Sequence, residues 1–297
     1  GTYLIAIQAV DVSDGDSQQS NSLNYQQAGG IQAAIDAAPD GTTIPLQAGT
    51  FDDTINIDTR ANLTLQGMGE ANTIVKSSTT LDWNIGGYGA TRQAVVRVID
   101  SSNIDISNLT LDFDLVKGNN IFGVFFWDTS GSLQNNTLQN MGVPGSTYYE
   151  ITSYFRGPGF SDTGRVGLEI VGNTFIDPGR LGIATHDYIH AQILNNTFYK
   201  TFDDFGYAIE LGSQSTGVIS GNTIYGFDYP ADSDGSASAG IYIENAFTGP
   251  SFANVTTAIS KDVSLTNNEI YDCQSGLHVG NEFDTYAGNV DIVVTAT

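Results

Sequence analysis

Apolar and polar residues alternate in short segments along most of the chain. Six segments share one pattern, in which an alternating stretch is followed by asparagine, a small or polar residue and another apolar residue. They are NIDISNLTLD (103–112), SLQNNTLQN (132–140), LEIVGNTFID (168–177), AQILNNTFYK (191–200), GVISGNTIYG (217–226) and VSLTNNEIYD (263–272). Alternation with a period of two predicts half-buried β-strands. The matched asparagines are Asn108, Asn136, Asn173, Asn196, Asn222 and Asn268, and the shortest interval between them, 23 residues, suits one turn of a parallel β-solenoid.

A second set of strand-like segments lies between the first. It comprises AVVRVID (94–100), GVFFWD (123–128), EITSYF (150–155), GIATHD (182–187), AIELGS (208–213), GIYIEN (240–245) and GLHVGN (276–281). We therefore expect two strands per repeat, stacked in parallel about 4.8 Å apart. Asparagine tolerates left-handed backbone geometry and bonds within its own turn, so the stacked asparagines are expected to line a corner.

The segment GGIQAAIDAAPDG (29–41) predicts a short amphipathic helix. Ile31, Ala34, Ile35 and Ala38 fall on one face, and Pro39-Asp40-Gly41 ends it. Such a helix would cap one end of the solenoid and cover its strand edges. Strand-like segments follow at 42–51, 54–57, 62–69 and 73–76, and no linker interrupts the chain, so residues 1–297 are expected to form a single domain.

IQAAIDAAPDGTTIPLQAGTFDDTINI (31–57) and NLTLQGMG (62–69) resemble the N-terminal part of right-handed parallel β-helix proteins of the pectate-lyase-like superfamily. The resemblance implies an all-β, single-domain right-handed parallel β-helix, a solenoid with a short N-terminal capping helix. The superfamily includes polysaccharide lyases, mannuronan C5-epimerases, glycoside hydrolases, pectin methylesterases, phage tailspikes and non-catalytic β-helices. The fold therefore implies a polysaccharide partner without deciding the reaction.

The charge of the chain excludes some partners. There are 33 acidic and 10 basic residues, for a net charge of −23, so repulsion by the phosphate backbone excludes nucleic acid. No apolar run reaches 18 residues, so no membrane span is expected. Few lysines and many Asp, Asn, Ser, Thr and Gly residues indicate a secreted or extracellular protein.

Stacking of the second set of strands brings chemically useful residues together. With Val96, Val124, Ile183, Ile209, Ile241 and Leu277 as inward anchors, the next position outward reads Arg97, Phe125, Ala184, Glu210, Tyr242 and His278. Three residues after the anchors come Ile99, Trp127, His186, Gly212, Glu244 and Gly280. From these positions and the adjacent Asp187 we predict the catalytic residues His186, Asp187, Glu210, Tyr242, Glu244 and His278.

The spacing of stacked strands predicts distances within this group. His186 and Glu244 would lie about 9.6 Å apart on either side of Gly212, and Glu210 and Glu244 about 8 Å apart. Gly212 would leave room for a sugar ring.

Two inserted loops, at about 141–165 and 226–239, would border this face. The first is expected to contribute aromatic rings that stack on sugars and an arginine that binds carboxylates. The predicted substrate-binding residues are Arg97, Phe125, Trp127, Tyr148, Tyr149, Tyr154, Arg156 and Arg180. The second loop carries Asp228, Asp232 and Asp234, whose carboxylates could bind Ca²⁺.

Three kinds of function fit these residues. A lyase or C5-epimerase would remove the C5 proton of a uronic acid, with His186 or His278 as base, Tyr242 as proton donor, and Arg156, Arg180 or Ca²⁺ neutralising the substrate carboxylate. LGIATHD (181–187) is similar to the Tyr-Gly-Phe-Asp-Pro-His-Glu type motif of mannuronan epimerases in Gly182, His186 and the following acid. An inverting glycoside hydrolase would use Glu210 and Glu244.

The third alternative is a non-catalytic glycan-binding or adhesive β-helix, for which the repeat alone would suffice. We rank the lyase or epimerase first. The C-terminal segment GNVDIVVTAT would leave a bare strand edge, which we expect further sequence or a partner to cover.

Overall fold

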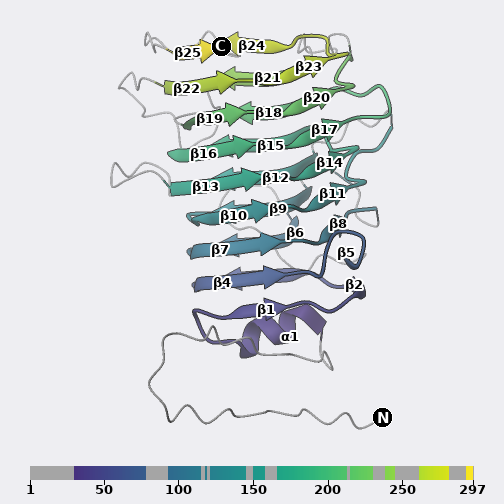
Figure 1. Ribbon diagram of the computed structural model, residues 1–297, viewed down its shortest axis with the longest axis vertical. Coiled ribbons are helices and arrows are strands. Elements are labelled where there is room, and N and C mark those ends of the chain that lie inside the picture. The colour runs from purple at the N-terminus through teal and green to yellow at the C-terminus, as the bar shows by residue number, and fades with distance from the viewer. Residues whose placement is uncertain are drawn as a thin grey trace.

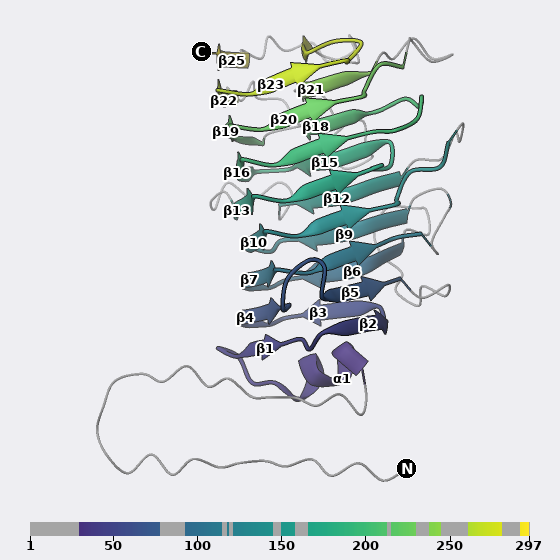
Figure 2. The same cartoon turned by 45° about the vertical axis from the view of Figure 1, so that its right-hand side comes forward.

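The computed structural model describes residues 30–77, 93–114, 118, 121–144, 150–157, 166–212, 215–229, 238–244, 261–280 and 292–296. Over these residues the chain winds into a parallel β-helix whose turns stack along the long axis (Figures 1 and 2). Every pairing between neighbouring strands is parallel and joins one turn to the next, as in β13 with β16 and β15 with β18. The predicted all-β solenoid is confirmed.

The strands form three sheets of nine, eight and eight strands. The first sheet contains β1 (Thr43–Pro45), β4 (Ala61–Gln66), β7 (Ser102–Ser107), β10 (Gly131–Gln134), β13 (Val166–Val171), β16 (Ile189–Leu194), β19 (Thr216–Ser220), β22 (Lys261–Thr266) and β25 (Ile292–Ala296). The second contains β2 (Gly49–Asp52), β5 (Thr73–Lys76), β8 (Thr110–Asp112), β11 (Thr137–Gln139), β14 (Thr174–Ile176), β17 (Thr197–Tyr199), β20 (Thr223–Tyr225) and β23 (Glu269–Tyr271). The third contains β3 (Ile55–Asp58), β6 (Gln93–Ile99), β9 (Ile121–Trp127), β12 (Glu150–Arg156), β15 (Leu181–His186), β18 (Tyr207–Leu211), β21 (Ala239–Glu244) and β24 (Leu277–Gly280).

Each complete turn therefore has three strands, and the expectation of two strands per repeat is wrong. The segments of the first pattern bend at a residue with positive φ, which separates a first-sheet strand from a short second-sheet strand. These corner residues are Asn108, Asn135, Gly172, Asn195, Gly221 and Asn267, with φ between 52° and 67°. Asparagine and glycine are the residues that adopt this left-handed geometry at least cost.

The stacked asparagines lie one position after this corner. Asn136, Asn173, Asn196, Asn222 and Asn268 form a ladder. In each member after Asn136, Oδ1 accepts hydrogen bonds from the backbone N–H and Nδ2 of the asparagine on the preceding turn, at 2.9–3.1 Å. Asn108 was expected in this column, but Thr137 pairs with Thr110, which places Leu109 beside Asn136 and Asn108 at the left-handed corner. The predicted column is thus correct for five of its six members.

The capping helix is α1 (Gly30–Ala37), which lies at one end of the solenoid beneath β1 (Figure 1). Ile31, Ala34 and Ile35 are buried, as its amphipathic pattern predicts. Asp53 caps the helix from outside, because its Oδ2 accepts the N–H of Ile31 at 2.6 Å. In the described part of the chain, no helix has the length and apolar character needed to cross a membrane.

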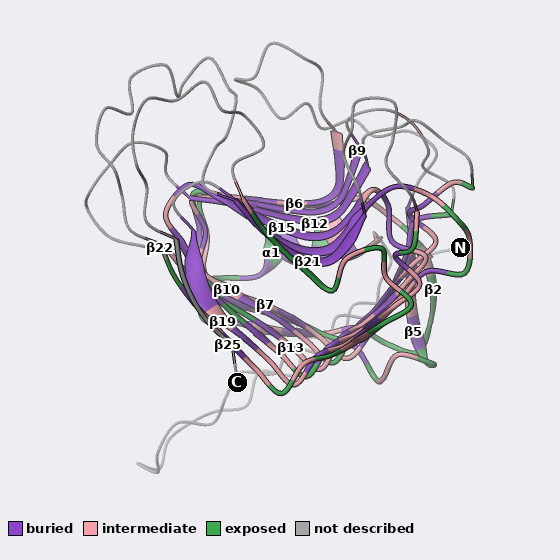
Figure 3. Cartoon of the chain, turned by 90° about the horizontal axis from the view of Figure 1, so that it is seen from above, coloured by how far each residue is buried: buried purple, intermediate pink, exposed green. Residues whose placement is uncertain are grey.

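The middle strands of the third sheet are buried on both faces. In β16 of the first sheet buried and exposed residues alternate, but every residue of β12, β15, β18 and β21 is buried (Figure 3). One face contributes to the core inside the solenoid, and the other carries a second apolar cluster. That cluster comprises Ala94, Phe122, Phe125, Ile151, Tyr154, Leu181, Ala184, Phe205, Tyr207, Ala239 and Tyr242. The expectation that these strands are half-buried is therefore wrong for the middle turns of the solenoid.

The predicted loop at 141–165 contains a strand, because β12 occupies Glu150–Arg156 and pairs with both β9 and β15. Of the second predicted loop, residues 230–237 lie outside the described residues. Leu277 was expected to point inward and be buried, but on the edge strand β24 it is 40% exposed and Val279 is 42% exposed.

Candidate active site

The predicted alignment of the third sheet is confirmed by strand register. Ala184 pairs with Glu210, Glu210 with Tyr242, and Tyr242 with His278, so these residues occupy one outward column on successive turns. β12 adds two residues that the alignment had omitted: Tyr154 joins this column beside Ala184, and Arg156 pairs with His186. Arg156 had been assigned to the loop at 141–165 and Tyr154 both to that loop and to the strand 150–155; both lie buried on β12 at the centre of the predicted site.

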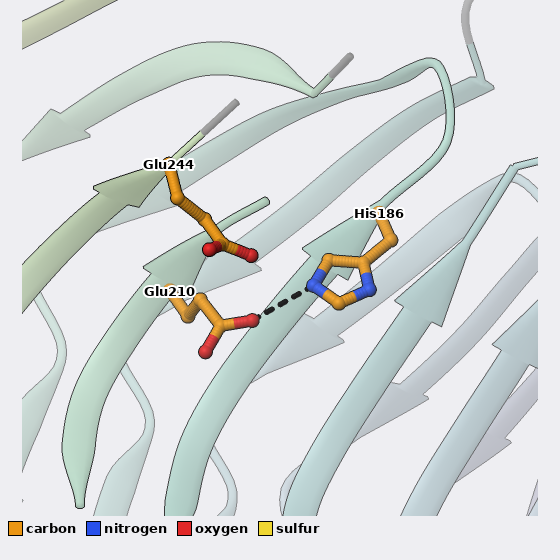
Figure 4. A group of neighbouring side chains, drawn as sticks. All are labelled: His186, Glu210 and Glu244. Carbon is orange, nitrogen blue, oxygen red and sulfur yellow. Dashed lines mark hydrogen bonds and ion pairs between the residues drawn. The ribbon is translucent and has the colours of Figure 1, made fainter. Parts of the chain in front are cut away.

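His186 lies at the centre of a hydrogen-bonded chain. Its Nδ1 is 3.0 Å from the hydroxyl of Tyr154, and its Nε2 is 2.7 Å from Glu210 Oε1 (Figure 4). The Tyr154 ring also contacts the imidazole edge-on, with ring centroids 5.3 Å apart. When the Tyr154 hydroxyl donates a hydrogen bond to Nδ1, the neutral imidazole carries its proton on Nε2 and donates a hydrogen bond to Glu210. The three side chains, from β12, β15 and β18, thus form a continuous path for a proton.

Glu244 extends from β21 toward the same point (Figure 4). One nitrogen of His186 and one carboxylate oxygen each of Glu210 and Glu244 all lie within 4.8 Å of one another. The separations expected from turn spacing, about 9.6 Å and 8 Å, do not describe these side-chain ends, because the side chains converge across the sheet. All three residues are buried.

Gly212 allows this convergence. A Cβ atom at this position would lie 2.3 Å from His186 Nε2 and 3.2 Å from Glu244 Oε1. The space above Gly212 was expected to admit a sugar ring, but the imidazole and the Glu244 carboxylate occupy it.

Asp187 follows His186 at a corner with φ of 59° and forms a buried ion pair with Arg156. Asp128 lies at the same kind of corner two turns away, where burial and then the charge of Asp100 raise the pKa of its carboxyl group. The pair with Asp187 engages Arg156 through its Nε. The expected role of Arg156 in neutralising a substrate carboxylate stays a prediction.

Tyr242 and His278 lie on the C-terminal side of the cluster. The Tyr242 ring packs between Tyr207 and His278, with ring centroids 4.6 Å and 4.8 Å away. Tyr242 is buried, whereas His278 is exposed on β24. The tyrosine that contacts the imidazole of His186 is thus Tyr154, and Tyr242 belongs to the aromatic cluster.

The remaining predicted binding residues are dispersed. Arg97 donates to Asn56 and lies 3.6 Å from the Asp58 carboxylate, three turns from His186. Arg180 is half-buried with its guanidinium 4.2 Å from the centre of the Phe205 ring. Phe125 is buried in the second apolar cluster, and Trp127 packs edge-on against it.

Four other predicted residues lie outside the described part of the chain. These are Tyr148 and Tyr149, expected to bind substrate, and Asp232 and Asp234, expected to bind Ca²⁺. The third member of the expected calcium set, Asp228, is exposed. The calcium site remains a prediction.

The comparisons with known proteins agree with this fold. A pectin methylesterase solved in complex with hexasaccharide VII is 12% identical, with 93% of this chain and 94% of that chain covered and a TM-score of 0.51. An alginate lyase from Paenibacillus sp. str. FPU-7 is 14% identical, covering 84% and 95%, with a TM-score of 0.34. The A-module of a mannuronan C-5 epimerase from Azotobacter vinelandii is 18% identical, covering 87% and 95%, with a TM-score of 0.31.

At 12% identity and a TM-score of 0.51, the pectin methylesterase shows a common fold only. A search of curated proteins finds no match. The family model described as "Right handed beta helix region" matches residues 96–292, which is more than half of the chain and includes every residue of the cluster around His186. The resemblance to right-handed parallel β-helix proteins is therefore confirmed, and the chain belongs to the right-handed β-helix family.

Proposed function

We propose that this protein is a secreted polysaccharide-acting enzyme that removes the C5 proton of a uronic acid residue, as a lyase or C5-epimerase. The observation that carries the proposal is the buried chain from Tyr154 through His186 to Glu210. A hydroxyl, an imidazole and a carboxylate in this order form the arrangement by which proteins activate a weakly acidic hydroxyl. Burial strengthens each of these hydrogen bonds by lowering the local dielectric.

Each member has a distinct role in this proposal. His186 Nδ1 accepts the proton of Tyr154, and Glu210 stabilises the imidazolium through Nε2. The resulting phenolate of Tyr154 is the base that removes the C5 proton, or after protonation the acid that returns one. Tyr154 thus replaces Tyr242 in the role expected from the sequence.

The proposed class of substrate is inferred from a protein of similar fold. The pectin methylesterase of similar fold was solved with a bound hexasaccharide, and the proposal takes a saccharide polymer as the ligand of this chain. The reaction comes from the residues, since fold alone does not decide it.

Charge limits how a polyuronate could bind. Among the described residues, Glu210, Glu244 and Asp187 are buried and the Arg156 guanidinium pairs with Asp187, and the whole chain has a net charge of −23. A substrate carboxylate would be repelled here unless a cation accompanies it. The proposed reaction therefore requires a cation, for which Ca²⁺ is one candidate.

The glutamate pair supports a second candidate, a glycoside hydrolase. Oxygens of Glu210 and Glu244 lie within 4.8 Å of each other. This is shorter than the gap of about 6.5–9.5 Å for inverting enzymes and nearer the gap of about 5–5.5 Å for retaining enzymes. The inverting mechanism expected from the sequence is thus replaced by a retaining one in this alternative.

One assay distinguishes these functions. The protein is incubated with a panel of uronic and neutral polysaccharides, with added calcium or with chelator. A lyase produces unsaturated ends that absorb at about 235 nm, and an epimerase changes the residue composition without that absorbance. Reducing ends without absorbance would indicate the hydrolase, and no change in any substrate would favour a non-catalytic glycan-binding β-helix.

Two variants then test the site. His186→Ala and Glu210→Gln are each expected to lower kcat by about 100-fold or more, because positioned proton transfer contributes about that much. His190→Ala is the matched control, since His190 lies exposed on the first sheet and bonds only to Thr216 among the described residues. Wild-type activity in both site variants would show that the chemistry lies elsewhere.

A further inference from the structure

We infer that His186, Glu210 and Glu244 bind one divalent transition-metal ion, with Zn²⁺ as the ion that fits best. This inference goes beyond the proposed function and does not depend on the substrate. It is also distinct from the calcium site expected at Asp228, Asp232 and Asp234, which involves different residues and a different class of ion.

The donor atoms are close enough to share an ion. All three lie within 4.8 Å of one another, and His186 Nε2 lies 2.7 Å from Glu210 Oε1. Ligands about 2.0–2.1 Å from a tetrahedral zinc are about 3.4 Å apart. Binding thus requires the histidine and Glu210 to separate by about 0.7 Å and Glu244 to move inward by up to about 1.4 Å.

The electrostatics of the cluster favour a cation. His186, Glu210 and Glu244 are 1%, 6% and 4% exposed, so two carboxylates share a volume from which water is largely removed. Arg156, the buried guanidinium nearby, is paired with Asp187. Two carboxylates held this close in a medium of low dielectric repel each other strongly, and a divalent ion replaces that repulsion with attraction. With a neutral imidazole, the three ligands and the ion have no net charge.

The surroundings already hold the ligands in place. Tyr154 contacts Nδ1 of His186 and directs Nε2 toward the glutamates, which is the outer contact that metal-binding histidines commonly have. Gly212 provides the hollow in which the ligands meet, because a Cβ there would lie 2.3 Å from Nε2. A metal on Nε2 would leave Nδ1–H to donate to the Tyr154 oxygen, so a metal-bound His186 could not also accept the proton of Tyr154, and the metal-bound and proton-accepting states of His186 are alternatives.

The donor set selects among ions. Imidazole nitrogen suits zinc and other first-row transition metals, whereas Ca²⁺ and Mg²⁺ prefer six or more oxygen ligands. One histidine and two carboxylates provide three protein ligands, the number found in catalytic zinc sites that retain an open position. We therefore expect Zn²⁺ to bind and Ca²⁺ not to bind at this site.

Metal binding is measured without any substrate. The full chain is treated with chelator and dialysed, then titrated with Zn²⁺ or Ca²⁺ by isothermal calorimetry, and Co²⁺ is added separately to record visible absorption. We expect one Zn²⁺ ion to bind per chain and the midpoint of thermal unfolding to rise with Zn²⁺ concentration. We also expect the visible absorption bands of Co²⁺ bound to histidine at a low coordination number. The inference would be overturned if Zn²⁺ did not bind, or if Ca²⁺ bound at this site with an affinity equal to that of Zn²⁺.

Three variants locate the ion. Glu244→Gln and Gly212→Ala should each abolish Zn²⁺ binding, the first by removing a ligand and the second by displacing the imidazole. Tyr154→Phe should weaken binding by about 10–100-fold while leaving one ion per chain, as loss of an outer contact does. His190→Ala is the control for adventitious binding to a surface histidine and should bind as the wild type does.

Other results would contradict the assignment. Zn²⁺ binding retained in Glu244→Gln, or lost in His190→Ala, would place the ion elsewhere. Far-UV circular dichroism shows whether each variant is folded. If a ligand variant unfolds, the partial loss of Zn²⁺ affinity in Tyr154→Phe, which keeps all three ligands, still tests the inference. Failure of Zn²⁺ to bind to a protein that is active would contradict the metal site alone, whereas inactivity of both the Zn²⁺-loaded and the chelated protein on every polysaccharide would contradict the proposed function alone.

Discussion

Hydrogen bonds from neighbouring residues determine the behaviour of the buried acids in the solenoid wall. Asp112 is 6% exposed, and its Oδ1 accepts from Asn140 Nδ2 at 3.0 Å and from the N–H of Asp114 at 3.1 Å. Lys76 Nζ lies 3.7 Å from its Oδ2. Burial by itself raises the pKa of Asp112, but the hydrogen bonds and Lys76 outweigh it, so the pKa lies below its usual value.

Asp112→Asn should therefore destabilise the fold at neutral pH by about 1–2 kcal/mol, as charge-assisted hydrogen bonds are lost. Because the folded-state pKa is lowered, this contribution is fully present above the unfolded pKa of about 3.9 and disappears as pH falls through the folded value. Urea unfolding at several pH values would show the stability gap between wild type and variant beginning to narrow below about pH 4 and closing below the folded-state pKa. The control Asp203→Asn, at an exposed position, should show no such difference. A stability gap that does not depend on pH would contradict this account.

Single residues also show what sequence alone could predict about the site. His186, Glu210 and Glu244 were predicted as neighbours because strand alternation and fixed turn spacing determine which backbone positions stack. The directions of their long side chains were not predictable, since the approach of Glu244 to His186 depends on the missing Cβ of Gly212. Tyr154 was overlooked as a partner of His186 because its segment, EITSYF, was assigned both to a strand and to a loop.

At the level of elements, the asparagine ladder joins the turns along one corner. Asn196 is 1% exposed; its Oδ1 accepts from Asn173, and its Nδ2 donates to Ile170 O at 2.8 Å and to Asn222 Oδ1 at 3.1 Å. The amide thus satisfies buried polar groups on both neighbouring turns. Since unsatisfied buried groups are costly, the middle of the ladder should contribute more to stability than its end.

Asn196→Ala should lower the free energy of unfolding by about 2–4 kcal/mol, because it leaves buried donors and acceptors of two other turns unpaired. Asn268→Ala, at the end of the ladder and half-buried, is the matched comparison and should cost about half as much. Urea unfolding followed by far-UV circular dichroism measures both. Equal losses in the two variants would argue against a cooperative ladder.

The third strand of each turn was not recognised in the sequence. Strands of the second sheet such as β14 and β17 have three residues each, too few to show a period of their own. They follow a first-sheet strand after a corner, so alternation continues through Leu168–Ile176 as if it were one strand. The left-handed corner that divides it depends on backbone geometry, which both Gly172 and Asn195 can adopt without a common sequence motif.

At the level of the whole molecule, the net charge of −23 opposes compaction. Like charges repel one another in the folded state more than in the expanded unfolded state, and added salt screens that repulsion. The thermal midpoint should therefore rise by several degrees as NaCl increases from about 0.02 M to about 1 M, where the Debye length falls to about 3 Å. Replacing NaCl with an equivalent amount of sucrose controls for general solvent effects, and a midpoint that falls with salt would contradict the prediction.

The central claim is that Tyr154, held by His186 and Glu210, carries the chemistry on a polysaccharide. The most direct measurement is kcat of Tyr154→Phe on the best substrate from the panel, beside Tyr199→Phe, a matched change in an outer stack of the second sheet. We predict a loss of about 100-fold or more for Tyr154→Phe and no more than about twofold for Tyr199→Phe, since only the first removes a positioned proton donor and acceptor. Wild-type kcat in Tyr154→Phe would contradict the account.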